Sequence, residues 1–182
     1  KLGLEIGTVK VTVLIETINA VFQMDEFLWE LKDHIVGLNA GRWDYLFSYQ
    51  KVYRNTKKVI LPDRSKVNMF VPFMSNYNKL LVDTCHKRGA FGMGGMSAQV
   101  IAKTNPKEVN EKALAGVKKD KERELNQGND GAWVAHPSLV QPIKNIFEKK
   151  FDGPNQLKKF NNEKIYRKDL LEEPKIDNAI TE

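Results

Sequence analysis

Residues 32–47 read Lys-Asp-His-Ile-Val-Gly-Leu-Asn-Ala-Gly-Arg-Trp-Asp-Tyr-Leu-Phe, and this stretch decides the expected fold. Its first half predicts a strand over residues 35–41, and a carboxylate, Asp44, follows shortly after. A second carboxylate, Glu16, follows an earlier apolar run. Two carboxylates at adjacent strand ends are enough to hold Mg²⁺, which takes its other ligands from substrate oxygens and water. The stretch therefore predicts a sheet with a magnesium site at the ends of two strands.

Short apolar runs alternate with helical patterns along the chain, which is typical of a parallel α/β fold. Residues 11–15 form a β-branched run, as expected for a strand that is buried on both faces. Further strands are predicted over residues 35–41, 90–96 and 131–135. Four βα units are half of the eight in a TIM (β/α)₈ barrel, so we expect the chain to form about half of such a barrel.

Helices are predicted between and after these strands. The first is expected to be capped by Asn19 and to carry apolar residues at helical spacing. Further helices are predicted over residues 76–87, 106–128 and 138–150, whereas residues 50–68 have the composition of a polar excursion. From Phe151 onward the pattern is polar. We therefore divide the chain into a half barrel over residues 1–150 and a linker with a short helix over residues 151–182.

Charge and composition exclude several classes of protein. The 182 residues carry a formal net charge of +6, but the excess Lys and Arg over 103–123 and 144–168 are interleaved with acids. This pattern indicates solvated helix faces, so no nucleic-acid partner is expected. We also expect no signal peptide and no membrane span. The single cysteine, Cys85, suits a reducing compartment and is expected to be a buried structural thiol.

The open edges of a half barrel have a further implication. A half barrel leaves two strand edges unpaired, and such edges favour aggregation unless other chain segments cover them. We therefore expect this chain to be an internal piece of a larger protein.

Residues 32–47 resemble the signature segment of malate synthases of the A type. The matching residues are His34, Gly37, Leu38, Asn39, Gly41, Trp43, Asp44, Tyr45 and Phe47. The resemblance covers nearly the whole chain and implies the C-terminal half of a barrel, followed in the family by a helical C-terminal domain. It also implies a Mg²⁺-dependent Claisen condensation of acetyl-CoA with glyoxylate, in which hydrolysis then releases malate and CoA.

The resemblance assigns roles to individual residues. Glu16 and Asp44, 28 residues apart (44 − 16), correspond to the two metal ligands. Glyoxylate is expected to contact both of them and the intervening residues Gly41, Arg42 and Trp43. The residues expected to contact acetyl-CoA are Trp133, Ala135 and Pro137. The catalytic Arg and Asp of the family match no segment of this chain, so the 182 residues alone are expected to be inactive.

Simpler interpretations of these residues stay open on position alone. Glu16 is also typical of the first turn of a helix, and Asp44 of an ordinary turn. Core packing is the alternative for Trp133. His34 is expected to be structural, whereas His136 is expected to point toward the site face.

Neighbouring segments are given supporting roles. Asp25 and Glu26 are expected on the surface, and Met93-Gly94-Gly95-Met96 is expected to shape the pocket without catalysing the reaction. A lyase of the citrate-lyase β or citramalyl-CoA type, a non-catalytic truncated remnant and a basic nucleic-acid-binding module remain as alternative functions. The expected compartment is the cytoplasm, with the peroxisome or glyoxysome as the alternative.

Overall fold

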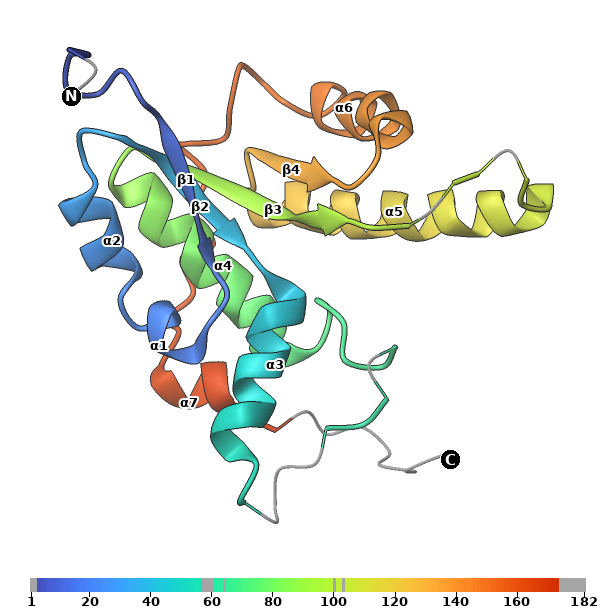
Figure 1. The fold of residues 1–182 in the computed structure, drawn as a ribbon, viewed down its shortest axis with the longest axis horizontal. Helices are drawn as coiled ribbons and strands as arrows, with labels where there is room; N and C mark the ends of the chain where they lie inside the picture. The colour runs from blue at the N-terminus through green and yellow to red at the C-terminus, as the bar shows by residue number, and fades with distance from the viewer. Residues whose placement is uncertain (1–2, 57–60, 64, 100, 103, 174–182) are drawn as a thin grey trace.

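The computed structural model describes residues 3–56, 61–63, 65–99, 101–102 and 104–173. Their centre is a four-stranded sheet in the order β1-β2-β3-β4, in which every neighbouring pair is parallel. The strands are β1 (Val11–Ile15), β2 (Ile35–Ala40), β3 (Phe91–Ser97) and β4 (Gly131–Val134). Strand order follows chain order, as expected for consecutive βα units (Figure 1).

Helices connect and cover the strands (Figure 1). They are α1 (Ile18–Val21), α2 (Met24–Glu30), α3 (Arg42–Tyr53), α4 (Pro72–Lys87), α5 (Lys107–Gln127), α6 (Val140–Glu148) and α7 (Arg167–Leu171), with a 3₁₀ turn over Pro137–Leu139. None of the helices in the described ranges is both long and apolar enough to cross a membrane.

Two apolar clusters bind the helices to one face of the sheet. In the larger cluster, Ile15 and Leu38 share a core with Phe73, Leu81 and other residues of α4. The smaller cluster joins α5 and α6 to β4, and its buried members are Val117, Leu125, Leu139, Ile143 and Phe147. Because side chains alternate along a strand, the residues between the core positions face the opposite side of the sheet.

The predicted strands are confirmed, each to within one residue at its ends. β3 forms in spite of its glycines because neighbouring elements approach its backbone closely. A Cβ at Gly92 would lie 3.1 Å from the Cα of Val82 on α4. The glycine therefore permits close packing of helix on strand.

The helix predictions are confirmed in part. The helix expected over 106–128 is α5, which ends at Gly128 with a left-handed φ of +97°. The cap assignment at Asn19 is wrong, because the Thr17 hydroxyl accepts the N–H of Ala20 and starts α1 there. The expected single helix is also divided into α1 and α2. α4 begins at Pro72, four residues before the predicted start.

Helix α3 was not predicted, and its last residues fall in the expected polar excursion over 50–68. Its apolar side chains are not confined to one side: Tyr45 and Tyr49 are buried, whereas Phe47 and Val52 are 63% and 57% exposed. This mixture hides the helical period in the sequence. Within the excursion, residues 57–60 and 64 lie outside the described part of the chain.

The segment after α6 returns along α4. The side chain of Asn161 donates to Asp83 on α4 at 2.9 Å, and the hydroxyls of Tyr45 and Tyr49 donate to carbonyls of α7 at 3.3 Å and 3.0 Å. The described part of the predicted linker, with its expected short helix, is therefore packed on the half barrel. The division at residue 150 stays a prediction.

The remaining predictions about single residues agree with the fold. Cys85 is fully buried, and burial raises the pKa of its thiol to about 12, as expected for a structural cysteine. Asp25 forms an exposed ion pair with Arg88 at 2.6 Å, and Glu26 is exposed. His34 lies before β2, at the end of the sheet away from Asp44, where its Nδ1 contacts the carbonyl of Val9 at 2.9 Å.

A buried histidine ties the same end of the sheet together. His86 contacts the carboxylate of Asp130 through Nε2 at 2.9 Å and the carbonyl of Lys159 through Nδ1 at 2.6 Å. Neither partner can donate a proton, so both ring nitrogens carry one and the imidazole is positively charged. Burial disfavours this charge, but the two hydrogen bonds outweigh it, and the pKa of His86 lies above its ordinary value.

We expect stability to fall as the pH rises above neutrality. A raised histidine pKa contributes stability that is complete below the ordinary pKa and is lost as the pH rises through the folded-state pKa. In urea unfolding of the native protein, His86→Gln is expected to cost about 1–3 kcal/mol near pH 6 and much less near pH 9. Lys158→Gln, which changes an exposed titratable side chain, is the control. An equal loss for His86→Gln at both pH values would contradict the charged imidazole.

Candidate metal- and substrate-binding site

A cavity of about 590 Å³ lies at the carboxyl ends of the strands. Each strand contributes to its lining, with Glu16 after β1, Gly41 after β2, Ser97 on β3 and Trp133 on β4. The first turn of α3, the segment before α4 and one side of α5 complete the wall. Ligand sites of parallel α/β folds are built at this end of the sheet. The cavity is thus where the sequence placed the site.

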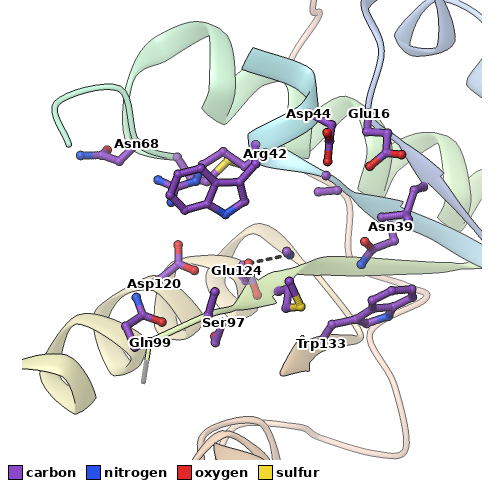
Figure 2. A pocket seen from close by; sticks show the side chains of 18 of the residues that line it. Glu16, Asn39, Arg42, Asp44, Asn68, Ser97, Gln99, Asp120, Glu124 and Trp133 are labelled. Atoms are coloured by element: carbon purple, nitrogen blue, oxygen red, sulfur yellow. Dashed lines mark hydrogen bonds between the residues drawn. The ribbon is translucent and has the colours of Figure 1, made fainter. Parts of the chain in front are cut away.

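The two predicted metal ligands meet at one end of this cavity, as Figure 2 shows. Glu16 is half-buried, and Asp44 lies exposed in the first turn of α3. Burial, followed by the charge of Asp44 and a hydrogen bond to it, raises the pKa of Glu16. Two carboxylates in contact favour either a shared proton or a bound cation, because like charges at this distance repel.

Gly41 makes the contact between these elements possible. A Cβ at this position would lie 2.7 Å from the Cβ of Glu16 and 3.0 Å from its Oε2. Only a residue without a side chain lets the end of β2 approach Glu16 so closely. The cradle for the carboxylate is therefore fixed by the glycine that the sequence singled out.

The hydroxyl of Tyr77 joins the two strand ends that carry these residues. It accepts the N–H of Gly41 at 2.9 Å and donates to the carbonyl of Ile15. Tyr77 is fully buried on α4, and its ring stacks on Tyr45 of α3 at a centroid distance of 4.5 Å. One side chain therefore fixes β1, β2 and α3 relative to one another.

The residues fit a divalent cation of the magnesium type. Within the described ranges, no three or more His, Cys, Asp or Glu side chains are grouped so that they could hold a metal ion. Two carboxylates suffice for Mg²⁺, since substrate and water oxygens complete its octahedron. α3 begins at Arg42, beside the pair. The positive end of its dipole favours an anion there.

Of the residues predicted to contact acetyl-CoA, one lines the cavity and two do not. Trp133 lines the cavity and is 39% exposed, so it is not a core residue. Ala135 and Pro137 are exposed and lie outside the cavity lining. His136 is also outside the lining, and its ring accepts the N–H of Ser138 to begin the 3₁₀ turn. The prediction that His136 points toward the site is therefore wrong, because its ring caps the 3₁₀ turn.

Several cavity residues were not anticipated. They come from the segment before α4, the end of β3 and α5, and include Asn68, Phe70, Gln99, Lys119, Asp120 and Glu124. On α5 the alternation of Lys with Glu and Asp predicts a solvated face, because sequence alone does not show which turn of a charged helix meets the sheet. The paired glycines Gly94 and Gly95 are the one sequence signal for this contact, since glycines in a strand mark close approach of another group.

Comparison with known proteins identifies the family. A family model described as malate synthase, TIM barrel domain, matches residues 1–173. The chain belongs to the malate synthase family. The glyoxysomal malate synthase of Brassica napus is 49% identical over 176 residues, which cover 95% of this chain and 31% of that protein. The glyoxysomal enzyme of Candida tropicalis is 53% identical over 156 residues, covering 86% and 28%.

The match to malate synthases confirms the predicted family and the TIM-barrel class of the fold. The chain spans less than a third of the length of these two relatives. Among solved structures, a citrate lyase from Burkholderia xenovorans LB400 has a TM-score of 0.54 at 18% identity and covers 76% of this chain and 38% of its own. RipC from Yersinia pestis has a TM-score of 0.52 at 13% identity, covering 76% and 51%. These two likenesses concern the fold alone.

The Tyr77 bridge can be tested by removing one oxygen atom. Tyr77→Phe leaves the N–H of Gly41 and the carbonyl of Ile15 without this partner in a buried place. We expect the free energy of unfolding to fall by about 1–3 kcal/mol. Tyr53→Phe, a half-buried tyrosine farther along α3, serves as the control in the same denaturant titration. Equal stability of both variants and the parent would contradict the bridging role.

Proposed function

We propose that this chain provides the metal and glyoxylate site of a malate synthase, which condenses acetyl-CoA with glyoxylate and releases malate and CoA. The observation that carries the proposal is the contact between Glu16, which follows β1, and Asp44, which lies in the first turn of α3 after β2, in a chain of this family. The malate synthases named above support it as relatives.

The roles of the residues follow from their positions. Glu16 and Asp44 would hold Mg²⁺, which as a Lewis acid stabilises negative charge developing on a bound aldehyde oxygen. The N–H groups at the start of α3, over Gly41, Arg42 and Trp43, would receive the glyoxylate carboxylate. Arg42 lies 4.5 Å from the ring of Trp43, so its guanidinium adds positive charge at this end. The metal would thus bind the aldehyde oxygen, and the N–H groups at the start of α3 would bind the carboxylate, so that glyoxylate is held at both ends.

Acetyl-CoA would enter from the other side of the cavity. Figure 2 shows Trp133 on the cavity wall away from Asp44. Glyoxylate would occupy the end with the carboxylates, so the acetyl group would lie between it and Trp133. The indole ring offers an apolar wall to the thioester end. Ala135 and Pro137 lie just beyond Trp133 in the chain and stay predicted contacts of the CoA tail.

Asp120 on α5 lines the cavity but is poorly suited to act as the general base of this reaction. Asp120 is paired with Arg123 at 3.0 Å and with Lys121 at 3.3 Å. Burial opposes ionisation of Asp120, but the two cations outweigh it and lower its pKa, which weakens it as a base. The family resemblance assigns the base and a catalytic arginine to segments that this chain does not match. We therefore propose that the 182 residues alone have no malate synthase activity.

The compartment of the protein is also a proposal. The cytoplasm is the first expectation, and the peroxisome or glyoxysome is the alternative. Relatives named as glyoxysomal, from Brassica napus and Cucumis sativus, favour the alternative. Imaging of the tagged native gene product decides between the two.

We expect Asp44→Ala to abolish activity in the longest product of the source gene. Loss of one of two metal ligands should lower kcat/KM by at least about 100-fold in glyoxylate-dependent thiol release from acetyl-CoA with Mg²⁺. Asp25→Ala, which removes an exposed acid paired with Arg88, is the matched control. A folded parent protein without malate formation would refute the proposal. Cleavage of citryl- or citramalyl-CoA would then indicate a lyase, and no reaction a non-catalytic remnant.

Gly41→Ala tests the cradle independently of turnover. The added Cβ would meet Glu16 at 2.7 Å and displace its carboxylate. We expect Mg²⁺ affinity, measured by titration calorimetry with glyoxylate present, to fall by about 10–100-fold. Gly153→Ala, where no heavy atom lies within 4 Å of the new Cβ, should bind as the parent does. Unchanged affinity in Gly41→Ala would remove Glu16 from the metal site.

A further inference from the structure

The pairing of strand β3 with β4 is interrupted at the edge of the cavity. Its residues Met93 and Gly94 pair with consecutive residues of β4, but the next pair is Ser97 with Val134. From Gly94 to Ser97 is three steps on β3, whereas from Ala132 to Val134 is two on β4. One extra residue therefore bulges out of β3 next to the site. Such bulges redirect side chains and leave backbone groups without ladder partners.

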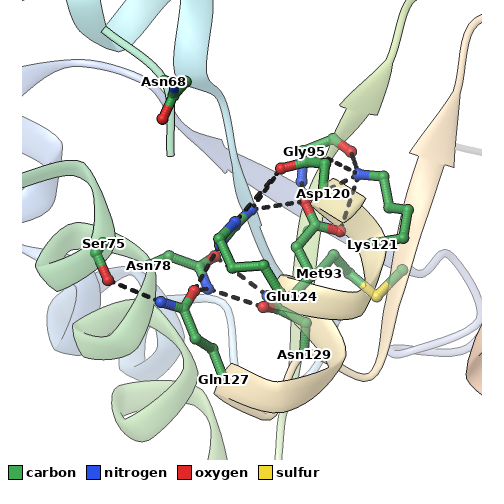
Figure 3. A network of polar contacts seen from close by, with 12 residues as sticks. Asn68, Ser75, Asn78, Met93, Gly95, Asp120, Lys121, Glu124, Gln127 and Asn129 are labelled. Atoms are coloured by element: carbon green, nitrogen blue, oxygen red, sulfur yellow. Dashed lines mark hydrogen bonds and ion pairs between the residues drawn. The ribbon is translucent and has the colours of Figure 1, made fainter. Parts of the chain in front are cut away.

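Two side chains of α5 bind the peptide groups at this bulge (Figure 3). The N–H of Gly95 donates to Glu124 Oε1 at 2.9 Å, and Lys121 Nζ donates to the carbonyl of Gly95 at 2.6 Å. Lys121 also donates to both oxygens of Glu124, each at 2.9 Å. The ion pair therefore satisfies both the N–H and the carbonyl of Gly95, which a neighbouring strand would otherwise bind.

The backbone of β3 is shaped to receive this pair. A Cβ at Gly94 would lie 2.0 Å from Glu124 Oε2, so any other residue would exclude the carboxylate. The carbonyl of Gly94 accepts the side-chain amide of Asn39, on β2, at 2.7 Å. The bulge is therefore held from two directions, by β2 and by α5.

Stability alone gives little reason for an ion pair at this place. The side chains of Lys121 and Glu124 are 0% and 1% exposed, and desolvation of such a pair offsets most of its attraction. Arg123 extends the polar contacts, since it donates to Gln127 at 2.5 Å and Gln127 donates to Ser75 on α4 at 2.8 Å. Arg123 also donates to Glu124 Oε1 at 3.3 Å, so these contacts connect the pair on α5 to α4.

The bulge sets the wall of the cavity opposite Glu16 and Asp44. Gly95, Met96 and Ser97 all line the cavity. The hydroxyl of Ser97 is buried and has no hydrogen-bond partner within the described ranges, so its place is set by the backbone and not by its own bonds. Whatever fixes the Gly95 peptide therefore fixes this wall.

We propose that Lys121 and Glu124 are positioning residues, whose ion pair holds the β3 bulge so that Met96 and Ser97 bound the part of the cavity that receives the acyl substrate. The inference rests on the proposed function for the identity of that substrate. It does not require either residue to touch it.

The double variant Lys121→Met/Glu124→Leu tests the proposal in the longest product of the source gene. It removes both charges and fills the space with apolar groups, which preserves stability in buried pairs of this kind. We expect KM for acetyl-CoA to rise by about 10-fold or more, because a wall displaced by about 1 Å misplaces the substrate. KM for glyoxylate should change much less. Lys118→Met/Glu122→Leu, an exposed pair at 4.0 Å on the same helix, is the matched control.

Amide exchange of Gly95 gives a readout that does not depend on activity. In the parent this N–H is held by Glu124 and should exchange slowly, whereas in the double variant it should exchange at least about 10-fold faster. A parent that makes no malate would refute the proposed function, and the exchange rate would still decide whether the pair holds the bulge. Unchanged exchange, or an unchanged KM for acetyl-CoA in an active enzyme, would overturn the positioning role.

A second, milder variant keeps the proposal testable if the double variant does not fold. Glu124→Gln keeps the shape of the side chain but removes the charge that Lys121 binds. We expect a smaller rise, about 3-fold, in both Gly95 exchange and KM for acetyl-CoA. Parent-like values for both quantities in this variant would overturn the proposal in the same way.

Discussion

The hydroxyl of Tyr77 hydrogen-bonds to the ends of both β1 and β2, and the geometry of the site depends on it. The ring is fully buried, and burial raises the pKa of its hydroxyl, so it stays a neutral donor and acceptor. It receives the N–H of Gly41 and donates to the carbonyl of Ile15. Glu16 is the residue after Ile15, and α3 with Asp44 begins after Gly41. The contact between the two carboxylates thus follows from one buried side chain of α4.

Two glycines, Gly41 directly after β2 and Gly94 within β3, play equivalent parts on opposite sides of the cavity. Gly41 leaves room for the carboxylate of Glu16, and Gly94 leaves room for that of Glu124. In each case an acid from another element occupies the volume of the missing Cβ. The difference lies in the partner of the acid. Glu124 is neutralised by Lys121, whereas Glu16 faces a second carboxylate. The first arrangement is complete within the protein, and the second favours a cation from solution.

The two ends of the sheet are specialised in a way that is common in parallel α/β folds. At the carboxyl ends, polar groups surround a cavity and include a pair of like charges. At the amino ends, His86 and Asp130 satisfy each other in a buried ion pair at 2.9 Å. That pair also receives the segment that returns along α4, through the carbonyl of Lys159. The buried ion pair at the amino ends is therefore complete within the protein, whereas the carboxyl ends carry the cavity and its paired carboxylates.

The sequence by itself determined the strands, helix α5 and the family, and it predicted the carboxylate pair Glu16 and Asp44 as a metal site. These depend on local patterns: apolar runs, a proline and glycine at helix ends, and one dense motif. Only the tertiary structure decided helix α3, the Tyr77 bridge and the Lys121–Glu124 pair. α3 has apolar side chains on both sides, so its period is hidden until packing selects one of them. Lys121 and Glu124 are typical surface residues in sequence, and they become buried because β3 bulges and Gly94 lacks a side chain. Contacts of this kind join residues far apart in the chain, and no local pattern encodes which of them will meet.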